Sequence, residues 1–265
     1  MSPRSPLRRS LRGTSLFPVF GLLLSALQAA EITGTIRDAD SGEKIPARLT
    51  IATADGNRHF LAETTGREGL GTAVPLEKER GESLEIHTAL SADPFRVALP
   101  PGVYSLTATR GHEYRPATVE VEVPEEGEIE PVELRLQRWI DLNQRGWFSG
   151  DVHCHLPRKD LETVMKAADL NVTFPLAGWV TDTTHRPDED SKTDEEWPTS
   201  SEVYAGTDRA YWARNTEYEL FTHDGETHPL GALLVLRHRE PLDLAVPPIK
   251  PMIEKARAEG AVIDL

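Results

Sequence analysis

The chain has 265 residues, enough for two domains, and its 38% hydrophobic and 27% charged residues are typical of a folded protein rather than a disordered one. Its 43 acidic residues outnumber 29 basic ones, which gives a net charge of −14. So acidic a chain argues against a nucleic-acid partner or anionic lipid, because both attract basic surfaces. The single cysteine, Cys154, excludes an intramolecular disulfide.

The first 30 residues have the three parts of a secretory signal peptide. Arginines open the segment, an apolar run follows at 16–27 (LFPVFGLLLSAL), and Gln28-Ala29-Ala30 offers small residues for cleavage. The alternative is a membrane anchor, but this run is shorter than the ~20 residues that a spanning helix needs. We therefore expect an exported protein, periplasmic or extracellular, with no membrane span in its mature chain.

Residues 31–138 are predicted to form a β-sandwich. Short runs rich in Val, Ile, Leu and Thr alternate with Gly, Pro and Asp turns, as in all-β domains. The strands are expected at 32–38, 46–52, 95–100, 103–110, 117–123 and 131–137. The glycine-rich and charged segment 64–83 lacks periodicity, which favours a long loop there.

Two stretches of this region resemble the carboxypeptidase regulatory-like, transthyretin-type domain. They are GTIRDADSGEKIPARLTI (34–51) and FRVALPPGVYSLTA (95–108). The resemblance implies an accessory domain without catalytic residues, and we expect Tyr104 to pack between its two sheets.

From residue 139 onward strands and helices alternate, which predicts an α/β domain over 139–265. Apolar residues at helical spacing favour helices at 159–170 and at 249–260, where Gly260 is the expected C-cap. Strands are predicted at 172–180 and 261–265, the latter buried, and a hairpin with a turn at 223–225 joins strands at 215–222 and 230–236. The intervening segment 182–202 is polar and acidic, as in a loop.

The stretch GDVHCH places two histidines at the end of a predicted strand. Alternation along a strand puts His153 and His155 on one side, where two imidazoles can share a metal ion, and turns Cys154 toward the interior. A chain with nine histidines also produces this spacing by chance, so surface or hydrogen-bonded histidines are the alternative.

The longer stretch GWFSGDVHCH resembles the opening strand of the PHP (polymerase and histidinol phosphatase) metal-dependent hydrolases, in particular the CehA/McbA-like branch. The resemblance implies a distorted barrel in which His153 and His155 bind divalent metal ions, Zn or Mn/Fe. In that family the metal activates water to hydrolyse ester, carbamate or phosphoester bonds.

The same family takes further ligands from a strand and its return strand, and NTEYELFTHDGETHPLGALLVL (215–236) resembles that hairpin. The resemblance makes Glu219 the candidate carboxylate ligand and His228 the candidate third imidazole. Glu217 shares a face with Glu219 and is its rival. The alternative is an exposed acidic hairpin without a ligand.

Two features depart from the family. The second strand is not followed by its usual T-D-H motif, although Asp182 or His185 could substitute. About 125 residues are also fewer than such a domain needs, so we expect only the N-terminal part of a PHP-like metallohydrolase, with no catalytic base assigned. The sequence thus predicts a secreted bacterial metal-dependent hydrolase of unknown substrate. The alternative is a non-catalytic extracellular binding protein with a degenerate hydrolase remnant.

Overall fold

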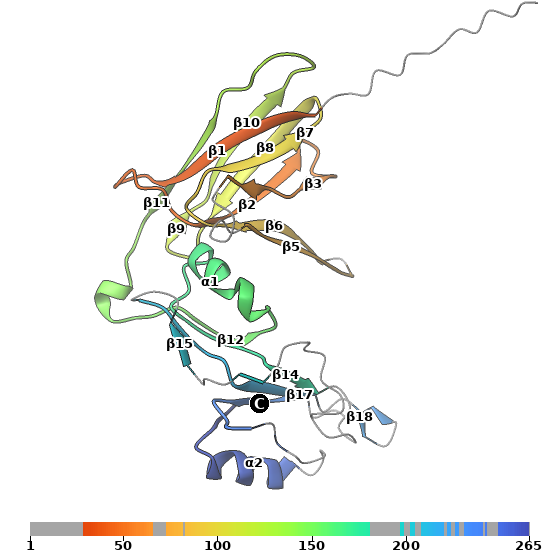
Figure 1. Ribbon diagram of the computed structural model, residues 1–265, viewed down its shortest axis with the longest axis vertical. Helices are drawn as coiled ribbons and strands as arrows, with labels where there is room; N and C mark the ends of the chain where they lie inside the picture. The colour runs from red at the N-terminus through yellow and green to blue at the C-terminus, as the bar shows by residue number, and fades with distance from the viewer. Residues whose placement is uncertain are drawn as a thin grey trace, which may run out of the picture.

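The computed structural model describes residues 29–65, 73–81, 83–180, 197–198, 202–204, 208–219, 222–223, 226–227, 231–240, 242 and 249–264. These residues form a mostly β structure of several sheets, mixed and antiparallel, with two α-helices (Figure 1). None of the described helices is long and apolar enough to cross a membrane. We call residues 30–138 the N-terminal unit and residues 143–264 the C-terminal unit.

Two sheets make up the N-terminal unit. The first has the strand order β4-β7-β1-β11-β9, and β1 and β11 are its parallel pair. Its strands are β1 (Ala30–Asp38), β4 (Glu63–Thr64), β7 (Phe95–Leu99), β9 (Tyr114–Arg115) and β11 (Val132–Arg138). The second has the order β10-β8-β2-β6-β5, with β3 on β2. Its strands are β2 (Ala47–Thr53), β3 (His59–Phe60), β5 (Ala73–Arg80), β6 (Ser83–Leu90), β8 (Gly102–Thr109) and β10 (Ala117–Val123).

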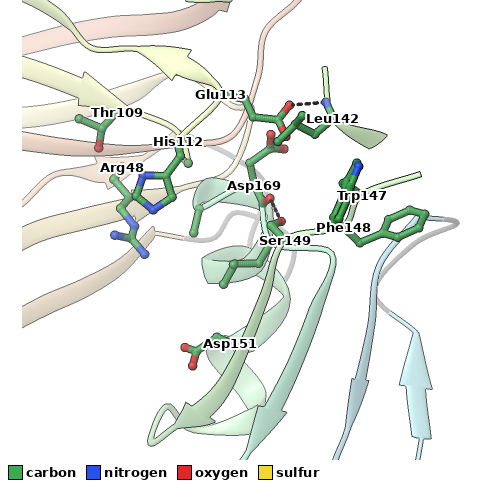
Figure 2. Close-up of a pocket in the computed structure, with 13 residues that line it drawn as sticks. Arg48, Thr109, His112, Glu113, Leu142, Trp147, Phe148, Ser149, Asp151 and Asp169 are labelled. Carbon is green, nitrogen blue, oxygen red and sulfur yellow. Dashed lines mark hydrogen bonds between the residues drawn. The ribbon is translucent and has the colours of Figure 1, made fainter. Parts of the chain in front are cut away.

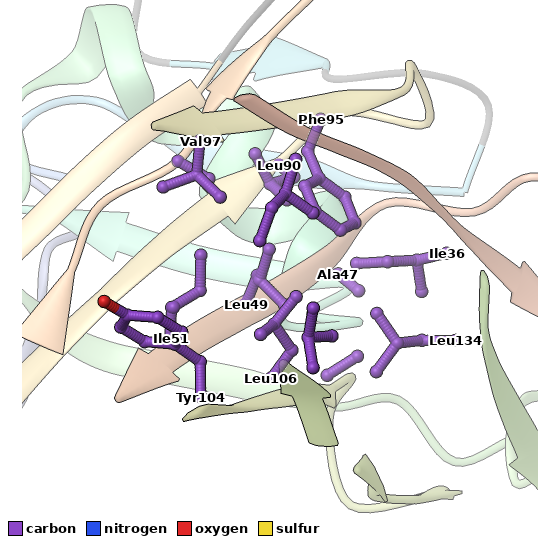
Figure 3. Packing of buried hydrophobic residues seen from close by; sticks show 14 of the residues in the cluster. Ile36, Ala47, Leu49, Ile51, Leu90, Phe95, Val97, Tyr104, Leu106 and Leu134 are labelled. Carbon is purple, nitrogen blue, oxygen red and sulfur yellow. The ribbon is translucent and has the colours of Figure 1, made fainter. Parts of the chain in front are cut away.

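The two sheets share one apolar core (Figure 3). Alternating residues of β1, β2, β7 and β8 enter it, as their burial patterns show. Tyr104 lies between the sheets as predicted, 2% exposed, with its hydroxyl donating to the Pro100 carbonyl at 2.7 Å. The six strands predicted in this region are all present, because clean alternation of apolar and polar residues marks each of them.

The structure corrects the prediction of a long loop at 64–83. Residues 73–80 form β5, which pairs with β6 along its whole length, while 66–72 and 82 lie outside the described residues. The distal half of this hairpin is charged and exposed, so it lacks the periodicity of a buried strand. Its proximal half contacts the C-terminal unit, where Val74 and Ala89 pack on Val164 and Ala167.

The C-terminal unit begins with a short 3₁₀ helix, η1 (Asn143–Arg145). One mixed sheet has the order β12-β13-β16-β15 and a second has β14-β17-β20-β21. Their strands are β12 (Gly150–Cys154), β13 (Val172–Pro175), β14 (Gly178–Val180), β15 (Glu202–Tyr204), β16 (Ala210–Trp212), β17 (Asn215–Glu219), β20 (Ala232–Leu236) and β21 (Val262–Asp264). Two-residue strands β18 (Thr222–His223) and β19 (Glu226–Thr227) pair across the predicted turn.

Residues 172–180, predicted as one strand, divide into β13 and β14, which belong to different sheets. Between them, the amide of Leu176 bonds to Cys154 at 2.8 Å, and the amide of Ala177 bonds to Asn215 at 2.9 Å. The Asn215 amide group also donates to the Pro175 carbonyl at 2.7 Å. The chain therefore passes from the sheet of β12 to the sheet of β17 within two residues, which brings those two strands together.

The helices were predicted within a few residues: α1 is Arg158–Ala167 and α2 is Ile249–Ala258. Gly260 follows α2 with a φ of 79°, as its C-cap position requires. The strand at the end of the chain differs from the prediction. β21 is mostly exposed rather than buried; among the described strands it lies at the sheet edge and pairs with β20 alone, antiparallel. Among the described strands, no barrel closes.

Candidate metal centre

The two histidines lie at the end of β12, and packing on α1 fixes which way they face. Cys154 is buried against Leu161 and Met165, and burial raises the pKa of its thiol. The neutral thiol is part of this apolar cluster, as predicted. Alternation then turns His153 and His155 outward, with side chains 43% and 33% exposed. The Asp151 carboxylate accepts the His153 amide at 3.0 Å and holds the backbone at this point.

The carboxylate that meets these histidines comes from β17. Glu217 pairs with Trp179 on β14 and with Leu234 on β20, so it lies in the middle of its sheet. The close approach of β14 to β17 depends on Gly178, because a Cβ at this position would lie 2.8 Å from the Thr216 hydroxyl oxygen. The Glu217 side chain is 5% exposed. A carboxylate so buried requires a compensating positive charge or donors.

Three ligand atoms converge at the meeting point of the two strands. His153 Nε2 lies 2.9 Å from His155 Nε2 and 3.1 Å from Glu217 Oε2. His155 Nε2 lies 3.1 Å from the same carboxylate oxygen. The three atoms therefore form a nearly equilateral triangle.

Hydrogen bonds alone do not satisfy this triangle. Each imidazole nitrogen carries at most one hydrogen, which cannot point at two neighbours, and an ionised carboxylate carries none. A cation shared by all three atoms satisfies them together. Neighbouring ligands ~2.1 Å from an octahedral metal lie ~3.0 Å apart, which matches the observed edges. His153, His155 and Glu217 could therefore hold a metal ion, and no other such group occurs among the described residues.

The surroundings orient one of the imidazoles. The His155 ring packs on Trp179, with ring centroids 4.3 Å apart and planes inclined by 56°. Trp179 is also the residue opposite Glu217 in the sheet, so one strand pairing positions both the carboxylate and the support of His155. Sequence reasoning did not select Trp179, and only this register reveals its role.

The remaining predicted ligands are placed as follows. Glu219 lies on β17 two residues beyond Glu217, opposite Ala232, but its side chain is outside the described residues. His228, Asp182 and His185 lie outside them entirely. The structure thus brings together the two histidines and Glu217, the residue named as the rival of Glu219.

His238 has a different environment. It is 1% exposed, lies 3.0 Å from the Thr216 hydroxyl and bonds to the Glu240 carbonyl. Burial lowers its pKa to about 4, so the ring is neutral at ordinary pH. Its two nitrogens are occupied by protein partners, which makes it a structural residue of the sheet.

The fold and the triad define a β-rich chain with a candidate metal centre between two sheets. Comparisons of the chain with protein-family models, with curated proteins and with solved structures find no match.

Proposed function

We propose that the chain is an exported metal-dependent hydrolase whose metal is held by His153, His155 and Glu217. The observation that carries the proposal is the convergence of three ligand atoms from residues 64 apart in sequence. The resemblance of GWFSGDVHCH to the PHP opening strand supports it independently, because it selects the same two histidines. It also supports a PHP-like α/β unit, and the separate resemblance of residues 34–51 and 95–108 supports a regulatory-like β-sandwich before it.

The three proposed ligands differ in charge and in exposure, and these differences give them different roles. A divalent ion bound here, Zn or Mn/Fe, would lower the pKa of a coordinated water toward ~7 and polarise the scissile group of an ester, carbamate or phosphoester. Glu217 supplies one negative charge from a buried position, and two neutral imidazoles leave the ion its net positive charge. The partly exposed histidines leave the other side of the site accessible to substrate.

Metal analysis of the purified protein tests the ligand set. We expect stoichiometric metal in the wild type, and its loss in the double variant His153→Ala/His155→Ala and in Glu217→Gln. Glu219→Gln is the matched control, since it removes a carboxylate two residues along the same strand. Full metal retention in Glu217→Gln would refute the assignment. Equal loss in both glutamate variants would show that the two carboxylates share the ion.

Turnover is tested separately with p-nitrophenyl esters and phosphodiesters, before and after chelation and metal restoration. We expect hydrolysis that is lost on chelation, returns with metal and is absent from the double histidine variant. Stoichiometric metal without turnover of any such substrate would favour the alternative, a non-catalytic extracellular binding protein.

A further inference from the structure

A second candidate site lies between the two units. A cavity of about 740 Å³ opens where the N-terminal unit meets residues 147–149, the start of β12 and the residues after α1 (Figure 2). This volume falls in the range of ~300–1,000 Å³ that small-molecule sites occupy, and domain junctions are a frequent location for such sites. Of the metal-centre strand β12, Asp151 is the residue that lines the cavity.

Two of the three carboxylates that line this cavity, Asp169 and Glu113, have arginine partners, whereas Asp151 accepts the His153 amide. Asp169 accepts from Arg110 and Arg138, each at 2.8 Å, and from Arg209 at 3.2 Å. Glu113 is bound by Arg138. These two acidic groups are therefore neutralised within the protein and do not repel an anion as free carboxylates would.

Arg48 is the opposite case. Arg48 lines the cavity, yet its side chain forms no hydrogen bond or ion pair with any described residue. The pKa of His87 is lowered mainly by burial, and the positive charge of Arg48 is the second cause. His112 also lines the cavity and offers a second donor. The charge of Arg48 is not balanced by a described carboxylate, so this corner of the cavity favours an anionic group.

Aromatic rings form another wall of the cavity. Trp147 and Phe148 are 71% and 67% exposed, unusually so for large apolar side chains. Their backbone is held on both sides, because the Trp147 amide bonds to Leu142 at 3.1 Å and the Ser149 amide bonds to Asn171 at 3.0 Å. Exposed rings on a fixed backbone provide a preformed stacking surface at little entropic cost.

We propose that this cavity binds a small organic anion: a flat apolar body that stacks on Trp147 and Phe148, with a carboxylate or phosphate directed to Arg48. Figure 2 shows the arginine and the two aromatic rings on different sides of Asp169. The ligand therefore extends past this neutralised carboxylate to reach both. The site differs from the metal centre in its residues and in its chemistry, since Arg48, Trp147 and Phe148 take no part in metal binding.

Calorimetric titration of the full chain tests the proposal, with 2-naphthoate, 2-naphthyl phosphate and uncharged 2-naphthalenemethanol as probes. We expect at least one of the two anions to bind tenfold or more tightly than the neutral alcohol, and the tighter one identifies the anionic group. Arg48→Gln should remove this preference, Arg48→Lys should retain most of it, and Trp147→Ala should weaken all three probes. Arg115→Gln, which changes an exposed arginine outside the cavity, is the control and should bind like the wild type.

A carboxylate or phosphate could instead ligate the metal, so the titrations are repeated on chelated protein and on His153→Ala/His155→Ala. Retained binding in both supports a separate site, whereas loss in either overturns the proposal. Equal affinity for anions and alcohol in the wild type also overturns it, and this comparison does not depend on any variant folding.

Discussion

Asp169 offers the sharpest test of how the two units are joined. Its side chain is 10% exposed and accepts from three arginines that are themselves mostly buried: Arg110, Arg209 and Arg138 are 9%, 11% and 22% exposed. Arg110 and Arg138 belong to the N-terminal unit, whereas Asp169 and Arg209 belong to the C-terminal one. The change Asp169→Asn removes the charge and keeps the shape. Asn also tolerates the left-handed φ of 55° at this position, so the backbone is not perturbed.

The expected loss of unfolding free energy follows from the partners that each arginine keeps when Asp169 is changed. Arg110 keeps the carbonyls of Pro46 and Lys166, Arg138 keeps Glu113, and Arg209 keeps Asp208. Each loses one charge-assisted bond, worth ~1.5–3 kcal/mol, and the asparagine carbonyl restores part of one. Breaking a buried pair from one side typically costs ~3–5 kcal/mol, and we expect Asp169→Asn to lower the free energy of unfolding by about that amount.

The measurement is urea unfolding of the full chain, with Glu133→Gln as the matched control. Glu133 also accepts from two arginines, Arg37 at 2.9 Å and Arg135 at 2.7 Å, but its side chain is 40% exposed. Screening by solvent limits such a surface cluster to below ~1 kcal/mol. The reasoning fails if the two variants cost the same, or if Asp169→Asn lies within ~1 kcal/mol of the wild type.

Three further predictions concern stability, domain structure and export. Burial lowers the pKa of His238 to about 4 from 6.5, so its stabilising effect is complete above pH 6.5 and is lost as the pH falls toward 4. We expect about 2 kcal/mol of unfolding free energy to be lost between about pH 8 and pH 5 through this ring, and a smaller pH dependence in His238→Asn. Residues 31–138 have their own core and should fold alone, with a β-type circular dichroism spectrum and a cooperative melt; a disordered spectrum would contradict this. N-terminal sequencing of the exported product should begin near Ala30 or Glu31, and recovery of Met1 on a cytosolic protein would refute export.

The elements that the sequence predicts well are those in which one face is buried. In β10 and β11 apolar and polar residues alternate without interruption, and their predicted bounds agree with the structure to within a residue. The hairpin of β5 and β6 was missed because only its proximal half packs on other elements, namely β2 and α1. The exposed half carries charged residues on both faces, so no periodicity marks it as a strand.

The candidate centre was predictable only in part, and the reason is register. Glu217 and Glu219 share a face of β17 because strand side chains repeat every two residues, so the pattern identifies the face and leaves the position open. The position is set by the passage from β13 to β14 at residues 176–177, which places Trp179 opposite Glu217. That passage depends on backbone hydrogen bonds to Cys154 and Asn215, which are both far from residues 176–177 in the sequence. The ligand is thus selected by how two sheets meet, which the sequence of the hairpin alone does not encode.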